Sequence, residues 1–496
     1  MSNRPFTPAW LAREPAATAL LPRGFDDPAA RAAAVQAAQR AVHPGVLEAL
    51  ARRPANAGAS LDALRDGAVC VVTGQQMGLF GGPLFTLYKA AAAVVNARAL
   101  AAETGVPCVP VFWLQSDDHD FAEIATCRVL DGEVGVPADP SDTRSVAALR
   151  FGPEVEGALD GLAELLGEGA DEVMATLRAC YAPGVAPDVA FAALIERMFK
   201  GTGLLVLDPR DPAMVEAARP IHLRAMAEAP AIADALVQRT QALESAGFFV
   251  QVHVRPQAPL SFVHQGSLDG PRRRVDTPVQ DAPFSTSALL RPLVQDLLLP
   301  TAAYVGGPGE LAYFAQLPPL YAHFGRPMPL AVPRARFRII DATTRRLLEQ
   351  TGLTPDEVAL PRDALLARLG QARPGQPTPD ALDAALRAVL PVLADFTPHA
   401  AALDKGLLRA TEQTAAAMAE GIERLIDRYR RTLARTDEVL VERLDRLRAR
   451  LQPEGAPQER VYGWPTFAAR VGVEAFTRAV LAATVPFDGG LKDLHL

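Results

Sequence analysis

Apolar residues in the first 340 positions fall mainly into short continuous runs, separated by longer segments with helical periodicity. Two of these runs, Ala68–Val72 and Cys108–Leu114, flank a long helical segment at Leu84–Ala102. Neither run alternates apolar and polar residues, which is typical of parallel strands that are buried on both faces. The pattern therefore predicts a parallel βαβ unit within a doubly wound α/β core. Further strands are expected at Leu204–Leu207, Phe248–Val254, Ala302–Val305 and Pro329–Val332.

Two stretches interrupt this succession of strands and helices. Residues of about 132–200 show mostly helical and loop-like patterns, and residues of about 256–300 are rich in proline. We expect both to be insertions into a core that spans residues 1–340. The second stretch contains three successive arginines, Arg272–Arg274. We interpret them as part of a solvated loop rather than as a phosphate clamp.

Beyond the last predicted strand the pattern becomes helical. Apolar side chains from Met418 to Leu451 recur at steps of three and four residues, with one step of seven, which is typical of a coiled coil. We therefore expect an α-helical coiled-coil domain over residues 341–455. Its apolar seam needs a partner helix, either the Ala381–Leu390 segment of the same chain or a second copy of the chain. Residues 456–496 are expected to pack back on the core.

The composition restricts the class of protein. The chain has 496 residues, of which 49% are hydrophobic and 22% charged, as in soluble globular proteins of several domains. Its net charge of −7 gives no electrostatic reason to bind nucleic acid or an anionic membrane surface. The first residues do not resemble a secretory signal, and the four cysteines lack CxxC spacing. We therefore expect a cytoplasmic protein without a zinc site or a disulfide framework.

Three loops that follow predicted strands carry unusual polar residues, and open parallel sheets bind ligands at these strand ends. The first loop, Thr73–Pro83, contains four glycines, among them Gly78, and the adjacent amides Gln75 and Gln76. It leads into a helix with Lys89, one of only four lysines among 50 basic residues. Glycines, amides and a rare lysine together favour an anion-binding loop over a simple glycine-rich turn.

The second loop follows Leu114 and contains Asp117, Asp118, His119 and Asp120. Flanking carboxylates favour the protonated imidazole, and a histidine that titrates in a cleft suits acid–base catalysis. The carboxylates could instead hold Mg²⁺ on a nucleotide, although their spacing is not a known metal motif. For Asp117 a solvated acidic turn is a further alternative.

The third loop, Tyr304–Ala312, formally satisfies the dinucleotide fingerprint G-x-G-x-x-A. The acidic residue expected about 20 positions later is missing, and Pro308 fits the motif poorly. We interpret the loop as an anion or carboxylate site rather than an NAD site. The chain also lacks the P-loop motif GxxxxGK[ST] and the nucleophile elbow GxSxG.

Long motifs cover these three loops: VVTGQQMGLFGGPLFTLYKA, PVFWLQSDDHDFAEI and YVGGPGELAYFAQLPPLYAHFGRPMPLAVPR. Together with Pro457–Tyr462 they resemble the cysteine ligase family of bacillithiol biosynthesis. The resemblance implies a Rossmann-like core with connecting-peptide insertions, a C-terminal coiled coil that forms a homodimer, and an enzyme that adds cysteine to glucosaminyl-malate. Two positions depart from the family pattern, since Asp117 stands where Glu is expected and Gly463 where Asn is expected.

The implied reaction joins the cysteine carboxyl to the glucosamine amine. Because a carboxylate does not acylate an amine at neutral pH without activation, we expect ATP as co-substrate, with Mg²⁺ as a further candidate. On this resemblance, phosphate or the malate carboxylate binds at Gln75, Gln76, Gly78 and Lys89. His119, supported by Asp118, takes a proton from the attacking ammonium, and Asp117 or Asp120 holds Mg²⁺ or the amine. Gly306, Gly307 and Glu310 line the opposite wall, with Arg334 as a further anion partner.

Two other functional classes compete with this hypothesis. One is a nucleotide- or NAD-binding enzyme of another pathway, which would need the missing ribose-binding acid. The other is a non-catalytic coiled-coil scaffold, which has no use for three polar loops at strand ends. A ligase acting on small molecules therefore fits the sequence best.

Overall fold

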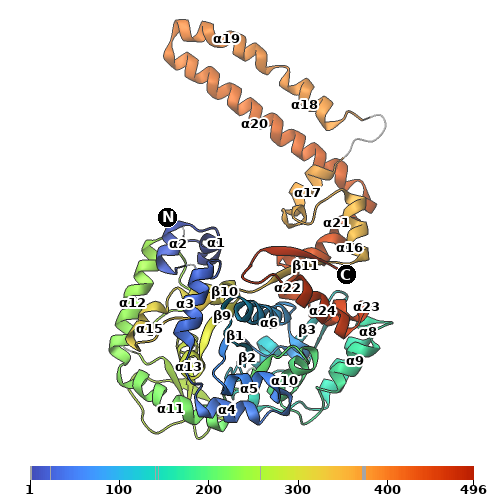
Figure 1. Ribbon diagram of the computed structural model, residues 1–496. Coiled ribbons are helices and arrows are strands. Elements are labelled where there is room, and N and C mark those ends of the chain that lie inside the picture. Colours follow the sequence, from blue (N-terminus) through green and yellow to red (C-terminus); the bar gives the residue numbers. More distant parts are fainter. Residues whose placement is uncertain (1–2, 23, 140, 143, 257, 371–375) are drawn as a thin grey trace. The chain divides into compact units, whose positions relative to one another are not determined.

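The computed structural model describes residues 3–22, 24–139, 141–142, 144–256, 258–370 and 376–496 (Figure 1). The chain divides into two compact units. The first, here called the core unit, comprises Met1–Arg338 and Glu459–Leu494. The second, the helical unit, comprises Ile339–Gln458 with His495–Leu496. The helical unit is therefore inserted into the sequence of the core unit.

A five-stranded parallel sheet forms the centre of the core unit. Its strands lie in the order β10 (Leu330–Pro333), β9 (Thr301–Gly306), β1 (Val69–Gln75), β2 (Cys108–Leu114) and β5 (Leu205–Leu207). The predicted βαβ unit is confirmed, because α6 (Phe85–Thr104) connects the parallel strands β1 and β2. Five of the six predicted strands are present, each within three residues of its expected bounds.

The register of the central strands brings the three polar loops together. Gln75, the last residue of β1, pairs with Leu114, the last residue of β2. On the other side of β1, Thr73 pairs with Val305 near the end of β9. Because parallel strands end at the same edge of the sheet, the loops after β1, β2 and β9 all begin there.

The predicted strand at Phe248–Val254 is wrong. Phe248 forms only an isolated bridge with Arg4. The Gln316 side chain then takes the place of a neighbouring strand, because its Nε2 donates to the Val252 carbonyl at 2.9 Å and its Oε1 accepts from the Val252 N–H at 3.1 Å. The backbone is thus hydrogen-bonded without entering a sheet.

A small antiparallel sheet lies within residues 256–300. Its strands are β7 (Arg272–Arg274), β6 (Ser261–His264) and β8 (Phe284–Thr286), in that order. The three arginines therefore form a strand, and their interpretation as a solvated loop is wrong. The guanidinium groups of Arg272 and Arg274 lie 4.6 and 4.7 Å from the centre of the Phe262 ring, within the range of cation–π interactions.

The remaining elements of the core unit are mainly helices. The N-terminal helices are α1 (Phe6–Leu11), α2 (Pro15–Leu20), α3 (Pro28–Ala38), α4 (Pro44–Ala51) and α5 (Ala59–Arg65). Between β2 and β5 lie α7 (Phe121–Ile124), β3 (Thr126–Val129), β4 (Gly132–Gly135), α8 (Glu154–Leu166), α9 (Asp171–Arg178) and α10 (Pro187–Met198). Further along are α11 (Pro212–Ala227), α12 (Ala229–Ser245), α13 (Leu290–Leu298), α14 (Pro308–Phe314) and α15 (Pro318–His323).

The C-terminal segment of the core unit packs next to the loop after β1. It contains α22 (Gln458–Val461), α23 (Pro465–Val471) and α24 (Val473–Ala483). The Trp464 indole N–H donates to the Phe80 carbonyl at 2.7 Å, and the Leu84 N–H donates to the Tyr462 carbonyl at 2.9 Å. Strand β12 (Leu491–His495) pairs with β11 (Arg336–Ile340), although no strand was expected after about residue 337.

The helical unit consists of six α-helices among its described residues. They are α16 (Ala342–Thr351), α17 (Arg362–Leu369), α18 (Pro379–Arg387), α19 (Leu390–Leu403), α20 (Lys405–Arg435) and α21 (Glu438–Leu451). The predicted seam is divided between α20 and α21, since Asp437 caps α21 by accepting a hydrogen bond from the Leu440 N–H. Helices α18 and α19 lie along α20 (Figure 1), so the Ala381–Leu390 segment pairs within the chain.

The two halves of the seam differ in burial. Leu444, Leu447 and Leu451 on α21 are buried in an apolar cluster with residues of α16 and α17. On α20 the side chains of Met418 and Leu425 are 36% and 51% exposed, while Leu433, near the end of that helix, is 5% exposed. Among the described residues, none of the helices is both long and apolar enough to cross a membrane.

Candidate active site

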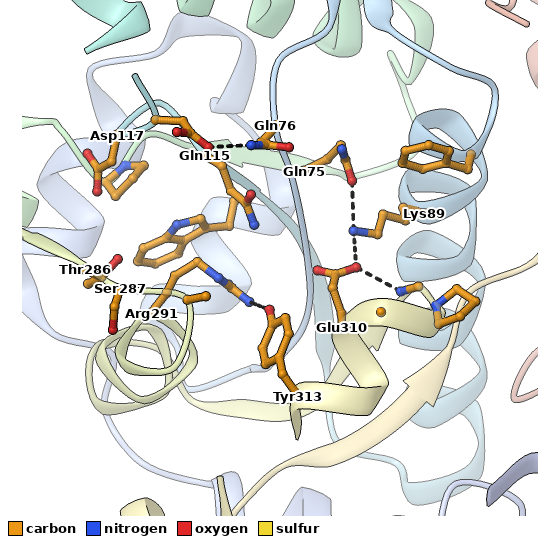
Figure 2. Close-up of a pocket in the computed structure, with 18 of the residues that line it drawn as sticks. Gln75, Gln76, Lys89, Gln115, Asp117, Thr286, Ser287, Arg291, Glu310 and Tyr313 are labelled. Carbon is orange, nitrogen blue, oxygen red and sulfur yellow. Dashed lines mark hydrogen bonds and ion pairs between the residues drawn. The ribbon is translucent and has the colours of Figure 1, made fainter. Parts of the chain in front are cut away.

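A cavity of about 470 Å³ opens where strands β1, β2 and β9 end (Figure 2). Eight of the predicted site residues line it: Gln75, Gln76, Lys89, Asp117, Asp118, Gly307, Glu310 and Arg334. They come from all three polar loops, so the structure brings these loops into one site. Four other predicted residues do not line the cavity: Gly78, His119, Asp120 and Gly306.

Lys89 connects the first loop to the third. It lies in the second turn of α6, and its ammonium donates to the Gly74 carbonyl at 2.6 Å and to Gln75 Oε1 at 3.0 Å. It also forms an ion pair with Glu310. These three acceptors match the three N–H donors of an ammonium. Burial lowers the pKa of Lys89, and the Glu310 carboxylate opposes that change. Lys89 is therefore satisfied by the protein itself.

Glu310 is held in the first turn of α14. One carboxylate oxygen accepts a hydrogen bond from the Gly307 N–H at 2.8 Å, as the N3 glutamate of a capping box does at a helix start. The other accepts from the Tyr304 hydroxyl at 2.6 Å. Burial alone would raise the pKa of Glu310, but the charges of Lys89 and Arg291 hold it below its ordinary value. The third loop was expected to offer backbone N–H groups to an anion. The Gly307 N–H is instead occupied by Glu310.

Arg291 on α13 is a second buried cation at the cavity, with a relative exposure of 6%. Its guanidinium donates to the hydroxyls of Tyr304 and Tyr313 at 3.0 and 3.1 Å, and to Gln295 Oε1 at 3.0 Å. All three of these acceptors are neutral. Lys89 and Arg291 therefore share the single carboxylate of Glu310 as their nearest negative charge.

Asp118 in the second loop is surrounded by donors. Its carboxylate accepts hydrogen bonds from Gln76, from Arg272 at 3.1 Å and from the backbone N–H of His119 at 2.8 Å. Burial would raise its pKa, but Arg272 and Gln76 hold the pKa of Asp118 below its usual value. Asp118 therefore remains charged and links the loops after β1 and β2 to strand β7.

Asp117 lies in the same loop but has a different environment. Its side chain makes no hydrogen bond or ion pair with any residue that the structure describes. Burial, together with the nearby carboxylates of Asp208 and Asp118, raises the pKa of Asp117 to about 6, although Arg210 and Arg272 oppose the change. Asp117 can therefore gain or lose a proton near neutral pH.

Arg334 reaches the cavity from the loop after β10. Its guanidinium forms a bidentate pair with Glu459, at 2.8 and 2.9 Å, and both side chains are almost fully buried. Arg336 also contacts Glu459, at 3.2 Å. The neighbouring Arg460 lies at the cavity with its guanidinium 5.9 Å from the centre of the Phe85 ring. The C-terminal segment thus contributes to the site through both residues.

The residues outside the cavity have other contacts. The side chain of His119 is 45% exposed, and its Nδ1 lies 3.2 Å from Asp118. Asp120 caps the short helix α7 by accepting from the Glu123 N–H at 3.1 Å. The Gly306 carbonyl accepts from the Arg334 N–H at 2.9 Å. Gly78 faces Gly82 so closely that a Cβ would lie 2.4 Å from the Gly82 Cα, so this glycine is required for the turn itself.

Sequence reasoning missed several residues that line the cavity. They are Phe85, Trp113, Gln115, Phe262, Arg272, Arg274, Thr286, Ser287, Arg291, Tyr313 and Arg460. The signal for β7 was available, because a strand directs alternate residues to one face and so places Arg272 and Arg274 together. No comparable pattern marked Arg291. In the sequence, an arginine next to a proline in an apolar helix looks the same whether its side chain is buried or exposed.

The donor set around the cavity fits an anion rather than a protein-bound metal. Among the residues described, no group of three or more His, Cys, Asp or Glu side chains is arranged to hold a metal ion. Six cationic side chains line the cavity against three carboxylates: Lys89, Arg272, Arg274, Arg291, Arg334 and Arg460 against Asp117, Asp118 and Glu310. Such an excess of positive charge attracts anionic ligands.

Comparison with known proteins gives the same family for both units. Residues 31–281 and 274–335 match the family "Bacillithiol biosynthesis BshC, N-terminal Rossmann-like domain". Residues 337–492 match "Bacillithiol biosynthesis BshC, C-terminal coiled-coil domain". The expected fold class, a Rossmann-like parallel-sheet core with a helical coiled-coil domain, is thereby confirmed.

Individual relatives are similar over most of their length. A protein of Koribacter versatilis named "Putative cysteine ligase BshC" is 36% identical over 86% of this chain and 84% of its own. Proteins with the same name from Solibacter usitatus and Salinibacter ruber are 32% and 34% identical, over 82% and 66% of this chain and 81% and 66% of theirs. Among solved structures, the arginyl-tRNA synthetase of Thermus thermophilus aligns with a TM-score of only 0.21 and 14% identity, over 89% of this chain and 86% of that one.

Proposed function

Because the chain belongs to the BshC family of bacillithiol biosynthesis, we propose that it joins L-cysteine to glucosaminyl-malate through an amide bond, in the last step of that synthesis. The observation that supports this substrate pair is the charge pattern of the cavity. Its cations suit the carboxylates of malate and of cysteine, and its acidic side chains suit the two amines. A cavity of about 470 Å³ is within the range of small-molecule sites.

The arginines of the cavity are the groups that we propose for the anions. Lys89 has no donor left for a ligand, because Gly74, Gln75 and Glu310 use all three. Arg274, in contrast, has no ion pair with any described residue and contacts the Phe262 ring. We therefore propose that Arg274, rather than Lys89, binds the malate carboxylate or a phosphate, with Arg272 and Arg460 as further cations of the same cavity. Lys89 then acts by holding Gln75 and Glu310 in position.

Activation of the cysteine carboxyl requires a co-substrate, and we propose ATP. The arginine-lined part of the cavity fits a phosphate group as well as it fits a carboxylate. A nucleoside triphosphate supplies, when bound, the phosphoryl or adenylyl group that makes the carboxyl reactive. Any Mg²⁺ would be held mainly by the phosphates and by water.

The assembly that we propose is a cytoplasmic homodimer. Apolar side chains on the α19–α20 hairpin support the dimer: Val392, Phe396, Leu403, Leu407, Met418 and Leu425 are between 36% and 76% exposed. Along each helix they are separated by 4, 7 or 11 residues, and such spacings place them on one face. The four cysteines are free thiols, as is usual in the cytoplasm.

The deciding experiment follows the product directly. Purified protein is incubated with cysteine, glucosaminyl-malate and Mg-ATP, and the thiol product is measured by mass spectrometry. We expect bacillithiol together with cleavage of ATP. No bacillithiol with or without nucleotide would overturn the proposed reaction, and product formation without ATP would overturn only the proposed co-substrate.

A further inference from the structure

The three carboxylates of the cavity differ in how they are held. Glu310 has Lys89, Tyr304 and the Gly307 N–H as partners. Asp118 has Gln76, Arg272 and the His119 N–H. Among the residues that the structure describes, Asp117 alone of the three has no hydrogen bond or ion pair to its side chain. A carboxylate that is already surrounded by donors is a poor proton acceptor, so of the three Asp117 has the most lone pairs available for a ligand.

The position of Asp117 also suits contact with a substrate. It lines the cavity together with the indole of Trp113 and the ring of Pro209. In Figure 2 it lies on the opposite side of the cavity from Lys89 and Glu310. An amine next to Asp117 would therefore be separated from Lys89, while Arg272 lies on the same side, 3.4 Å from the Asp117 carbonyl. His119 cannot take this place, because its imidazole is half exposed and does not line the cavity.

We propose that Asp117 is the general base of the reaction and that it binds the ammonium group of the amine substrate. This inference rests on the proposed function and reassigns the base from His119. The Asp117 carboxylate takes one N–H proton from the glucosamine ammonium, which leaves a neutral amine and a carboxylic acid. The nitrogen lone pair then attacks the activated carboxyl carbon of cysteine. A C–N bond forms, the C–O bond to the phosphate leaving group breaks with its electron pair, and the second nitrogen proton passes to water.

The charged groups around Asp117 set the pH at which this base works. Asp118 on the same loop and Asp208 after β5 disfavour its ionised form, whereas Arg210 and Arg272 favour it. Since burial outweighs the arginines, the pKa is near 6. A general base is most effective when its pKa lies near the working pH. We therefore expect kcat/KM, which reports groups of the free protein, to fall as the pH decreases through about 6, because protonated Asp117 cannot accept the substrate proton.

A calorimetric experiment tests the contact without requiring turnover. Glucosaminyl-malate is titrated into the full chain at pH 6, in two buffers with different ionisation enthalpies. We expect the wild type to release about half a proton per site, because a bound ammonium lowers the pKa of Asp117. Asp117→Asn should bind without this release, and His119→Ala should retain it. The same proton release in Asp117→Asn, or no binding to the wild type, overturns the proposal.

Kinetic measurements test the base itself. Asp117→Asn should reduce kcat by about 10²- to 10⁴-fold, the usual contribution of a general base, and its kcat/KM should no longer decline below pH 6. Asp117→Glu should restore much of the activity, since it returns a carboxylate to the same place. Asp131→Asn, an exposed aspartate outside the site, is the matched control. A normal kcat in Asp117→Asn, with an unchanged melting temperature, overturns the proposal. If the wild type forms no product, the proposed function is contradicted, and the calorimetric test then decides whether Asp117 binds the amine.

Discussion

In the core unit charged side chains are buried around a cavity, whereas in the helical unit apolar side chains lie at the surface of a hairpin. Lys89, Arg291 and Arg334 are at most 6% exposed. Lys89 and Arg334 have the carboxylates of Glu310 and Glu459 as partners, whereas Arg291 donates only to neutral groups. Val392 and Leu403 are 65% and 76% exposed. Both arrangements cost stability in the isolated chain, and both are expected where something from outside completes the structure. We infer a small anionic ligand for the core unit and a second apolar surface for the helical unit.

The largest effect is expected when charge is placed on the exposed hairpin. Val392→Asp combined with Leu403→Asp puts four carboxylates into the interface of a dimer, where burial of each removed side chain contributes about 1.5–3 kcal/mol. We expect the dissociation constant to rise by about 10³-fold or more, measured by light scattering. Val439→Asp changes an exposed apolar residue on α21, outside the hairpin, and should leave the dimer intact. Equal masses for all three proteins would contradict the dimer surface.

The buried ion pair of the core unit can be broken from one side. Glu310→Gln keeps the shape of the side chain but leaves Lys89 without its negative partner, and such changes cost about 3–5 kcal/mol. We expect a clear decrease in the denaturant midpoint. Glu474→Gln, which removes an exposed pair with Arg478, is the control and should change stability little. Similar losses for both variants would mean that the cavity charges contribute no more than surface charges.

The smallest effect concerns ligand affinity. Arg274→Ala removes a cation from the cavity, and a lost charge-assisted hydrogen bond costs about 1.5–3 kcal/mol, which is roughly a 10- to 150-fold weaker affinity. Arg273→Ala is the matched control, because it is the neighbouring residue of β7 and does not line the cavity. Isothermal calorimetry with glucosaminyl-malate measures both. Equal affinities would remove Arg274 from the anion site.

The parallel sheet and the place of the site could be predicted from the sequence, because both depend on local pattern. Buried runs such as Cys108–Leu114 contain only apolar residues, and the polar loops that follow them mark the edge of the sheet where ligands bind. The rule that parallel strands end at one edge then predicts that these loops lie together, whereas the residue pairing of β1 is known only from the structure. Eight of the twelve residues expected in the site lie at the cavity for this reason.

Contacts between residues distant in the sequence could not be predicted. The ion pair between Lys89 and Glu310 joins positions more than 200 residues apart, and the sequence does not show that the lysine is thereby saturated. Likewise Gln316 replaces a strand partner for residues near Val252 through a side chain. The periodic spacing of apolar residues in α20 and α21 was visible in the sequence. The sequence did not show that α21 buries its half of the seam within the chain.

The ion pair between Arg334 and Glu459 has a consequence for how the protein is made. Translation delivers Arg334 and the whole parallel sheet well before Glu459, since the helical unit lies between them in the sequence. Until residues 459–464 leave the ribosome, the nascent chain has a cationic cavity wall without its carboxylate, and Trp464 has not yet reached the loop at Phe80. A polypeptide released early, anywhere before Glu459, therefore lacks a finished cavity. The cavity is completed only after the helical unit has been synthesised, so a chain that stops within that unit can form its parallel sheet without forming the finished site.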